Sequence, residues 1–168
     1  MKKLIILSLL FSVLTFTSCK KDDDSGLQPK GNYPEVSTLL FTLTSANWGH
    51  FGTAGSAGDG YEADLLATNI SSDIASTGTV LCYISFDNSL WAQISFTLPF
   101  STWIESWTGS FKAGHYLIDI QDSDFFTQLP TSTIFARVVT LTHTARIQNP
   151  NVDLSNYNEV KKAFNLKD

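Results

Sequence analysis

Short runs of alternating hydrophobic and polar residues recur from Val36 onward, separated by Gly, Asn, Asp and Pro. Alternation with a period of two is typical of strands that bury one face, and regular short strands favour an antiparallel sandwich or barrel. We therefore expect a mainly β protein, an antiparallel β-sandwich of about seven strands. The expected strands are Ser37–Thr44, Tyr61–Thr68, Thr79–Phe86, Leu90–Leu98, Phe100–Trp107, His115–Gln121 and Ser132–Thr142.

The third and fourth of these strands form the clearest hairpin. Pairing Phe86 with Leu90 across a three-residue turn sets the apolar residues of both strands on one face, as far as Val80 opposite Phe96. The other face is mixed and could be either solvent-facing or half covered. It carries Leu81, Tyr83, Trp91, Gln93, Ser95 and Thr97.

Three further segments depart from this half-buried pattern. Ser132–Thr142 is apolar on both sides and should therefore be a central strand. Two isoleucines four residues apart, behind an Asn and ahead of a Gly, predict a short helical turn near 70–77. An Asn followed three residues later by Glu159 resembles a capping box, and it predicts a short C-terminal helix over Ser155–Phe164 that packs on the sandwich.

The start of the chain has the pattern of an export signal. Two lysines precede a 13-residue apolar run, Leu4–Phe16, which is too short to span a bilayer. The run ends at Phe16-Thr17-Ser18-Cys19, which resembles the lipobox of bacterial lipoproteins, in which the cysteine is acylated and becomes the new N-terminus. We expect residues 1–18 to be a lipoprotein signal peptide and Cys19 to be the lipidation site. The alternative is a plain secretory signal in which Cys19 is incidental.

A charged stretch, Lys20–Gly26, follows this cysteine and cannot bury a core. We expect residues 19–35 to be a lipidated flexible tether and residues 36–168 to be a single β-sandwich domain. A cysteine followed by Lys and an acidic run resembles the lipoproteins of Bacteroidota-type Gram-negative bacteria. That resemblance implies an outer-membrane, lipid-anchored protein exposed at the cell surface, whereas a merely solubilising linker is the alternative.

Composition and charge restrict the possible partners. The chain is 43% hydrophobic and 16% charged, with a formal net charge of −5, which is globular composition. Between Val36 and Ala136 the one cation, Lys112, stands against nine carboxylates, so nucleic acid is a poor partner. With Cys19 assigned to the lipid, Cys82 has no disulfide partner and is expected to be a buried, inert thiol.

Few motifs suggest a cofactor, a metal or an active site. Gly58-x-Gly60-x-x-Ala63 imitates a dinucleotide fingerprint, but a strand follows where a helix is required, so a loop is the better interpretation. Asp119, Asp122 and Asp124 could bind Ca²⁺, although acidic turns after strands are common and no EF-hand spacing accompanies them. We expect no cofactor and no enzymatic activity, because no nucleophile–base pair or metal set can be argued.

Tryptophan residues give the sharpest candidate site. If Trp103, Glu105 and Trp107 share one face of a strand, two indoles flank a carboxylate, a surface on which sugars stack. The alternative, which we favour on general grounds, is that one or both indoles fill the core. Trp91 and Tyr83 on the outer face of the hairpin form a reserve platform.

The middle of the chain also carries a resemblance. Its markers are Ile70-x-x-x-Ile74-x-x-x-Gly78-x-Val80-x-x-Tyr83 and Leu129-Pro130-Thr131 ahead of Phe135-x-Arg137-Val138-Val139. With these markers, the run from Tyr61 to Thr142 resembles a β-rich domain of Bacteroidota-type surface lipoproteins. The resemblance implies a fold and a cellular location, and it implies no activity.

Two classes of function remain. The first is a non-enzymatic binding module held at the membrane by the lipid, for glycans or other neutral polar ligands. The second is a structural or adhesive lipoprotein whose partner is another envelope protein and whose exposed sheet edges would serve for contact.

Overall fold

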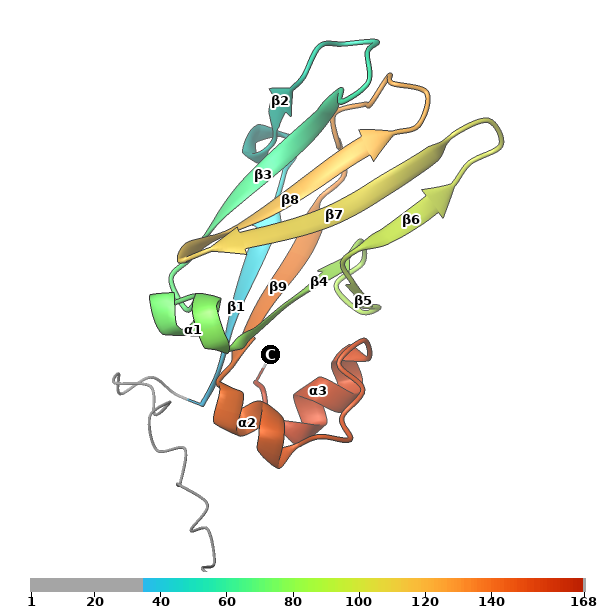
Figure 1. The fold of residues 1–168 in the computed structure, drawn as a ribbon. Coiled ribbons are helices and arrows are strands. Elements are labelled where there is room, and N and C mark those ends of the chain that lie inside the picture. The colour runs from blue at the N-terminus through green and yellow to red at the C-terminus, as the bar shows by residue number, and fades with distance from the viewer. Residues whose placement is uncertain (1–34, 168) are drawn as a thin grey trace, which may run out of the picture. The chain divides into compact units, whose positions relative to one another are not determined.

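Two antiparallel β-sheets face each other in residues 35–167, the part of the chain described by this computed structural model (Figure 1). The four-stranded sheet has the order β1-β9-β4-β5 and consists of β1 (Val36–Leu43), β9 (Ile134–Leu141), β4 (Thr79–Ser85) and β5 (Ala92–Gln93). The five-stranded sheet has the order β2-β3-β8-β7-β6 and consists of β2 (Gly49–Phe51), β3 (Gly60–Ala67), β8 (Gly114–Asp122), β7 (Ile104–Lys112) and β6 (Phe96–Pro99). The mainly β, antiparallel fold expected from the sequence is confirmed. The expected signal peptide and Cys19 lie outside the described residues.

A 3-10 turn at Ser45–Asn47 and three short α-helices complete the fold of the described residues, and a side chain caps each α-helix at its start. In α1 (Ser72–Thr77), the Ser71 hydroxyl accepts a hydrogen bond from the backbone of Ile74. Thr142 caps α2 (His143–Gln148) and Asn156 caps α3 (Tyr157–Ala163) in the same way. The helical turn near 70–77 and the C-terminal helix were predicted, whereas α2 was not. Among the described residues no helix is long and apolar enough to cross a bilayer.

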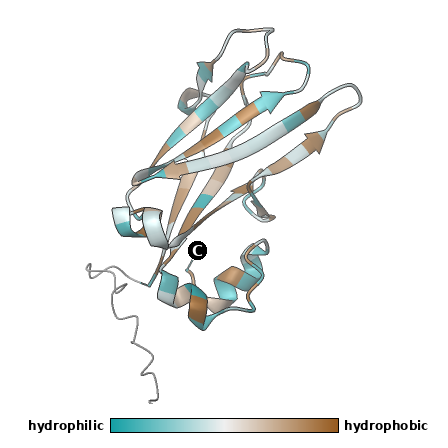
Figure 2. Cartoon of the chain, in the orientation of Figure 1, coloured by the Kyte–Doolittle hydropathy of each residue, from teal (hydrophilic) through white to brown (hydrophobic). Residues whose placement is uncertain are grey.

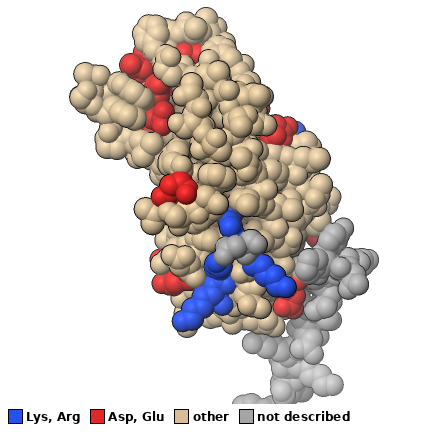
Figure 3. Space-filling model, turned by 180° about the vertical axis from the view of Figure 1, so that it is seen from behind, with Lys and Arg blue, Asp and Glu red and all other residues tan. Residues whose placement is uncertain are grey.

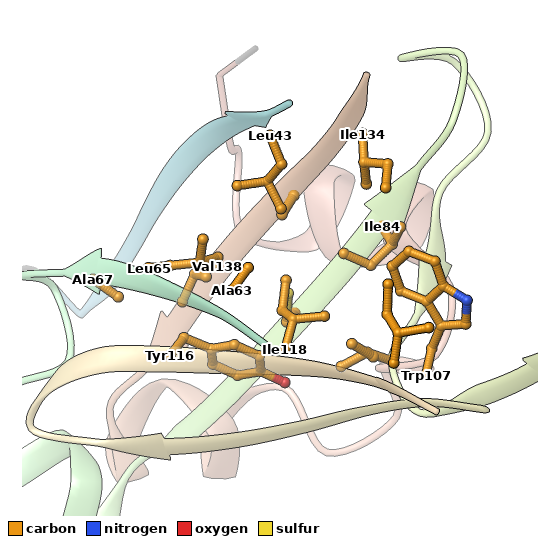
Figure 4. Close-up of a cluster of buried hydrophobic side chains, with 14 of the residues drawn as sticks. Leu43, Ala63, Leu65, Ala67, Ile84, Trp107, Tyr116, Ile118, Ile134 and Val138 are labelled. Carbon is orange, nitrogen blue, oxygen red and sulfur yellow. The ribbon is translucent and has the colours of Figure 1, made fainter. Parts of the chain in front are cut away.

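The main core lies between the two sheets (Figure 4). Alternation along each strand supplies it, because every second side chain points to the same face. Figure 2 shows this alternation as brown and teal bands along the strands. The buried members of this core include Ala63, Leu65, Ile84, Trp107, Tyr116, Ile118, Ile134 and Val138.

A second core lies on the outer face of the four-stranded sheet, beneath the C-terminal helices. Leu81, Tyr83, Val139, Leu141, Ala145, Tyr157 and Val160 are all buried there. The Tyr83 hydroxyl donates a hydrogen bond to the backbone oxygen of Leu154 at 2.6 Å, between α2 and α3. The outer face of the hairpin is therefore half covered, because Leu81 and Tyr83 are buried whereas Ser95 and Thr97 are exposed. This second core also explains why β9, the central strand as predicted, is apolar on both sides.

The expected strand Leu90–Leu98 is divided between the two sheets. Ile84 does pair with Ala92 in the four-stranded sheet, as predicted. The chain then crosses, and Phe96 pairs with Trp107 in the five-stranded sheet instead of with Val80. The Phe96 ring stacks on the Trp107 ring with centroids 5.7 Å apart, so the crossing places an aromatic residue in the core.

The Gly-rich segment forms a loop between β2 and β3, and a strand follows it as expected. Gly52 has φ +79°, and a Cβ there would lie 2.1 Å from the backbone oxygen of Gly58. Glycine is therefore required at position 52 to close the loop. Strand β2 itself was not predicted, since three residues are too few to show alternation.

Candidate functional site

The expected platform of Trp103, Glu105 and Trp107 does not form. Trp107 points into the core with 2% of its surface exposed, and its indole nitrogen donates to Glu105 Oε1 at 2.6 Å. Trp103 lies just before β7 rather than on it. The alternative that one indole fills the core is therefore correct for Trp107, because a ring inside the core cannot stack on a ligand.

Trp103 is half-buried at the turn between β6 and β7. Its ring stacks on Phe100 with centroids 3.9 Å apart and an interplanar angle of 14°. One face of the indole is thus already occupied by a residue of the same turn. Trp103 therefore pairs with Phe100 and does not form a platform with Trp107.

The reserve pair, Trp91 and Tyr83, does not form a platform either, because one of the two side chains is buried and the other is not. Tyr83 is completely buried under α3, with its ring 5.1 Å from the ring of Tyr157. Trp91 lies nearer the surface, half-buried, and its ring is 5.5 Å from that same tyrosine. Of the two, only Trp91 can reach a ligand.

Trp91 forms part of the wall of a cavity of about 470 Å³ between the β4–β5 connection, β6 and the start of α3. We call this cavity the Trp91 groove. Its apolar wall includes Phe86 and Leu90, which are 49% and 78% exposed. Its polar lining consists of Ser89, Thr97, Asn156 and Asn158. Apolar walls with a few polar groups are typical of small-molecule sites.

A smaller cavity of about 280 Å³ adjoins the groove on the other side of Trp91 and Tyr157. Arg137 and Lys161 are among its lining residues. The Arg137 guanidinium lies 4.7 Å from the centroid of the Trp91 ring, and its Nη1 donates to the Tyr157 hydroxyl at 2.5 Å. A cation over an indole face is attracted by the ring quadrupole, so Arg137 helps to fix the orientation of Trp91.

The cations of the described residues are concentrated in the last part of the chain, and two of them, Arg137 and Lys161, line the smaller cavity. Figure 3 shows a group of Lys and Arg side chains on one face, with some Asp and Glu side chains beside it and others further away. Five of the six cations among residues 35–167 come from β9 onward, and Lys112 is the sixth. The five are Arg137, Arg146, Lys161, Lys162 and Lys167.

The turn that carries Leu90 and Trp91 is held by Asp87. Its carboxylate accepts hydrogen bonds from the backbone of Ser89 and Leu90 at 2.8 and 2.9 Å. It also accepts one from the Ser89 hydroxyl at 2.6 Å. These donors, the hydroxyl first, hold the pKa of Asp87 well below its usual range. The groove wall is therefore organised before any ligand arrives.

The three aspartates considered for Ca²⁺ do not converge. Asp119 points to the outer face of β8, where it pairs with Glu62, whereas Asp122 points inward and is buried. Burial first, and then the nearby Glu105, raise the pKa of Asp122 to about 6. Within residues 35–167 no group of three or more acidic, Cys or His side chains could hold a metal ion.

Two histidine–carboxylate pairs were not visible in the sequence. His50 Nε2 lies 2.7 Å from Asp59 Oδ1, and His115 Nδ1 lies 2.7 Å from Asp64 Oδ1. His115 and Asp64 are 51 residues apart, and His50 and Asp59 are nine residues apart across the loop between β2 and β3, so no motif spacing connects either pair. Cys82, by contrast, is buried as expected, and burial raises its pKa.

Comparison of the chain with protein-family models, curated proteins and solved structures found no match. The geometry of the Trp91 groove is therefore the main basis for a functional argument.

Proposed function

We propose that this protein is a lipid-anchored lipoprotein of the outer membrane, exposed at the cell surface, that acts as a non-enzymatic binding module. Its ligand is a glycan or another neutral polar molecule, and its site is the Trp91 groove. The observation that carries the proposal is the half-buried indole of Trp91 in the wall of an apolar cavity that Asn156 and Asn158 also line. The signal-like segment before Cys19 supports the anchor.

The chemistry of the groove suits a sugar. The C–H faces of a pyranose stack on aromatic rings, while hydroxyl groups need donors and acceptors at the rim. Trp91 supplies the ring, and Asn156 and Asn158 line the groove as amide-bearing side chains. An amide both donates and accepts, so it can match a sugar hydroxyl in either direction.

Binding can be tested with the full chain in detergent on a glycan array, followed by calorimetric titration of any glycan that binds. We expect Trp91→Ala to weaken binding at least about tenfold, because it removes the stacking surface. Trp103→Ala is the matched control, since it removes a half-buried indole outside the groove and should leave the affinity unchanged.

Trp91 also packs on Tyr157, so a loss of binding must be separated from a loss of structure. Asn158→Ala changes an exposed residue of the groove and should weaken binding without moving the melting temperature. Unchanged affinity in both Trp91→Ala and Asn158→Ala would rule out this groove as the site.

The anchor can be tested separately in cells. Metabolic labelling with a fatty-acid analogue should tag the wild-type protein and disappear in Cys19→Ala. Labelling that persists in the mutant would contradict lipidation at Cys19. Digestion of whole cells by added protease tests surface exposure, because an inward-facing protein would be protected.

A further inference from the structure

The two sheets have four edge strands, and one of them is much longer than the others. Strand β1 has eight residues, whereas β5, β2 and β6 have two, three and four. Within residues 35–167, β1 pairs with β9 alone, so its other side presents backbone donors and acceptors without a neighbouring strand. Such an edge is a template for pairing with another strand.

Strand β1 also lacks the features that usually prevent edge-to-edge pairing. Its sequence, Val-Ser-Thr-Leu-Leu-Phe-Thr-Leu, contains no charged residue and no proline. Its pairing with β9 runs without interruption from Val36 to Leu43, so no bulge bends the edge away. Leu40, near the middle of the strand, is 50% exposed.

The outward-pointing backbone groups can be assigned from the ladder. The Glu35 backbone oxygen accepts from the Thr142 backbone at 2.9 Å, so this pair is hydrogen-bonded toward β9. In an antiparallel ladder such pairs alternate with pairs whose N–H and C=O groups point the other way. The outward-pointing groups therefore belong to Val36, Thr38, Leu40 and Thr42.

We propose that this edge binds the same edge of a second copy of the chain, forming an antiparallel β1–β1 pair about a two-fold axis. The strand is self-complementary. The residues whose backbone groups point away from β9 are two threonines and two aliphatic residues, so pairing two copies brings no charge opposite a like charge. Pairing joins the two four-stranded sheets into one of eight strands and covers the edge on both copies, so association stops at a dimer.

The dimer is independent of the Trp91 groove, which lies beside β5 and β6 rather than β1. A single strand pair is a small interface, and we expect a dissociation constant in the micromolar range. The interface contains no ion pair, so the dimer should persist when salt is raised.

Sedimentation velocity of the full chain, in a density-matched detergent over a range of concentrations, tests the proposal. We expect the wild type to pass from monomer to dimer with concentration. Leu40→Lys places a charge on the edge and should weaken the dimer at least about tenfold. Leu66→Lys is the matched control, because Leu66 is 64% exposed but lies on β3 of the other sheet, and it should dimerise like the wild type.

A second variant distinguishes backbone pairing from a side-chain effect. Thr38→Pro removes an N–H that points away from β9, so the ladder within the domain stays complete while one bond to the second copy is lost. It should weaken the dimer and leave the melting temperature within a few degrees of the wild type.

Three results would overturn the proposal. The first is a wild-type chain that remains monomeric at the highest concentration, as it would if residues 20–34 of the same chain covered β1. The second is a dimer that survives both Leu40→Lys and Thr38→Pro. The third is a dimer that dissociates in high salt, because charges elsewhere would then hold it.

Discussion

Replacing Trp107 by alanine should be far more damaging than the same change at Trp103. The two tryptophans are four residues apart and were both candidates for a ligand platform. Trp107 lies in the core, where its ring contacts the rings of Trp48, Phe86 and Phe96 at centroid distances of 5.9, 5.5 and 5.7 Å. Trp103 contacts one aromatic ring and is partly exposed.

The loss of stability in each variant depends on the contacts that the indole makes and on the cavity that its removal creates. Truncating a buried Trp to Ala costs about 3–5 kcal/mol through lost burial and the cavity that remains. Trp107→Ala also removes the donor to Glu105 Oε1, and an orphaned polar group adds about 1–3 kcal/mol where water cannot replace the bond. We expect a loss of about 4 kcal/mol at Trp107, in the range of large core truncations, and about 1 kcal/mol at Trp103.

Urea denaturation followed by circular dichroism measures both free energies of unfolding. Trp107→Phe is the intermediate control, because it keeps an aromatic ring in the core but loses the hydrogen bond to Glu105. It should fall between the wild type and Trp107→Ala. Equal losses at positions 103 and 107, or a loss below about 1 kcal/mol at Trp107, would show that the core assignment is wrong.

Three further outcomes follow from buried groups. Because the pKa of Asp122 is raised to about 6, its contribution to the free energy of unfolding is present below about pH 4 and is lost as the pH rises through about 6. Asp122→Asn should therefore flatten the decline of that free energy with pH, measured by urea titrations at several pH values. A pH profile unchanged in this variant would contradict the argument. Cys82 should not react with an aqueous alkylating reagent until the domain unfolds, and rapid labelling of the native protein would refute its burial. Tyr83→Phe should lower stability by about 1–2 kcal/mol, because the Leu154 oxygen loses its donor, and an unchanged melting curve would count against that bond.

The sequence predicts most of the strands because alternation reports directly on a buried face. The expected strand Phe100–Trp107, however, begins and ends four to five residues too early compared with β7, Ile104–Lys112, and nine strands form in the described residues instead of about seven. Val36–Leu43 and Ile134–Leu141 lie within one or two residues of the expected ranges. The crossing between β5 and β6 was missed for a physical reason. The hydrophobic pattern continues through Phe96 whether the strand stays in one sheet or joins the other, because both faces lead into the same core.

The candidate site was harder to predict, because alternation does not reveal what covers a face. Tyr83 and Trp91 occupy the same outer surface, and only the docking of α3 decides that the first is buried and the second is half exposed. Two of the four polar residues that line the groove, Asn156 and Asn158, are far from Trp91 in sequence. No local spacing connects them, so the groove could not be assembled without the tertiary structure.

The pairing of β1 with β9 has a consequence for the order of folding. Val36 lies opposite Leu141, so the first strand finds its partner only after nearly all of the domain has been synthesised. Contacts between residues so distant in sequence close slowly, on the millisecond-to-second scale for all-β domains. Until β9 is available, β1 has no intramolecular partner in the four-stranded sheet. A nascent or exported chain would therefore remain open until its C-terminal part arrives, and the strand made first would be among the last to be locked in place.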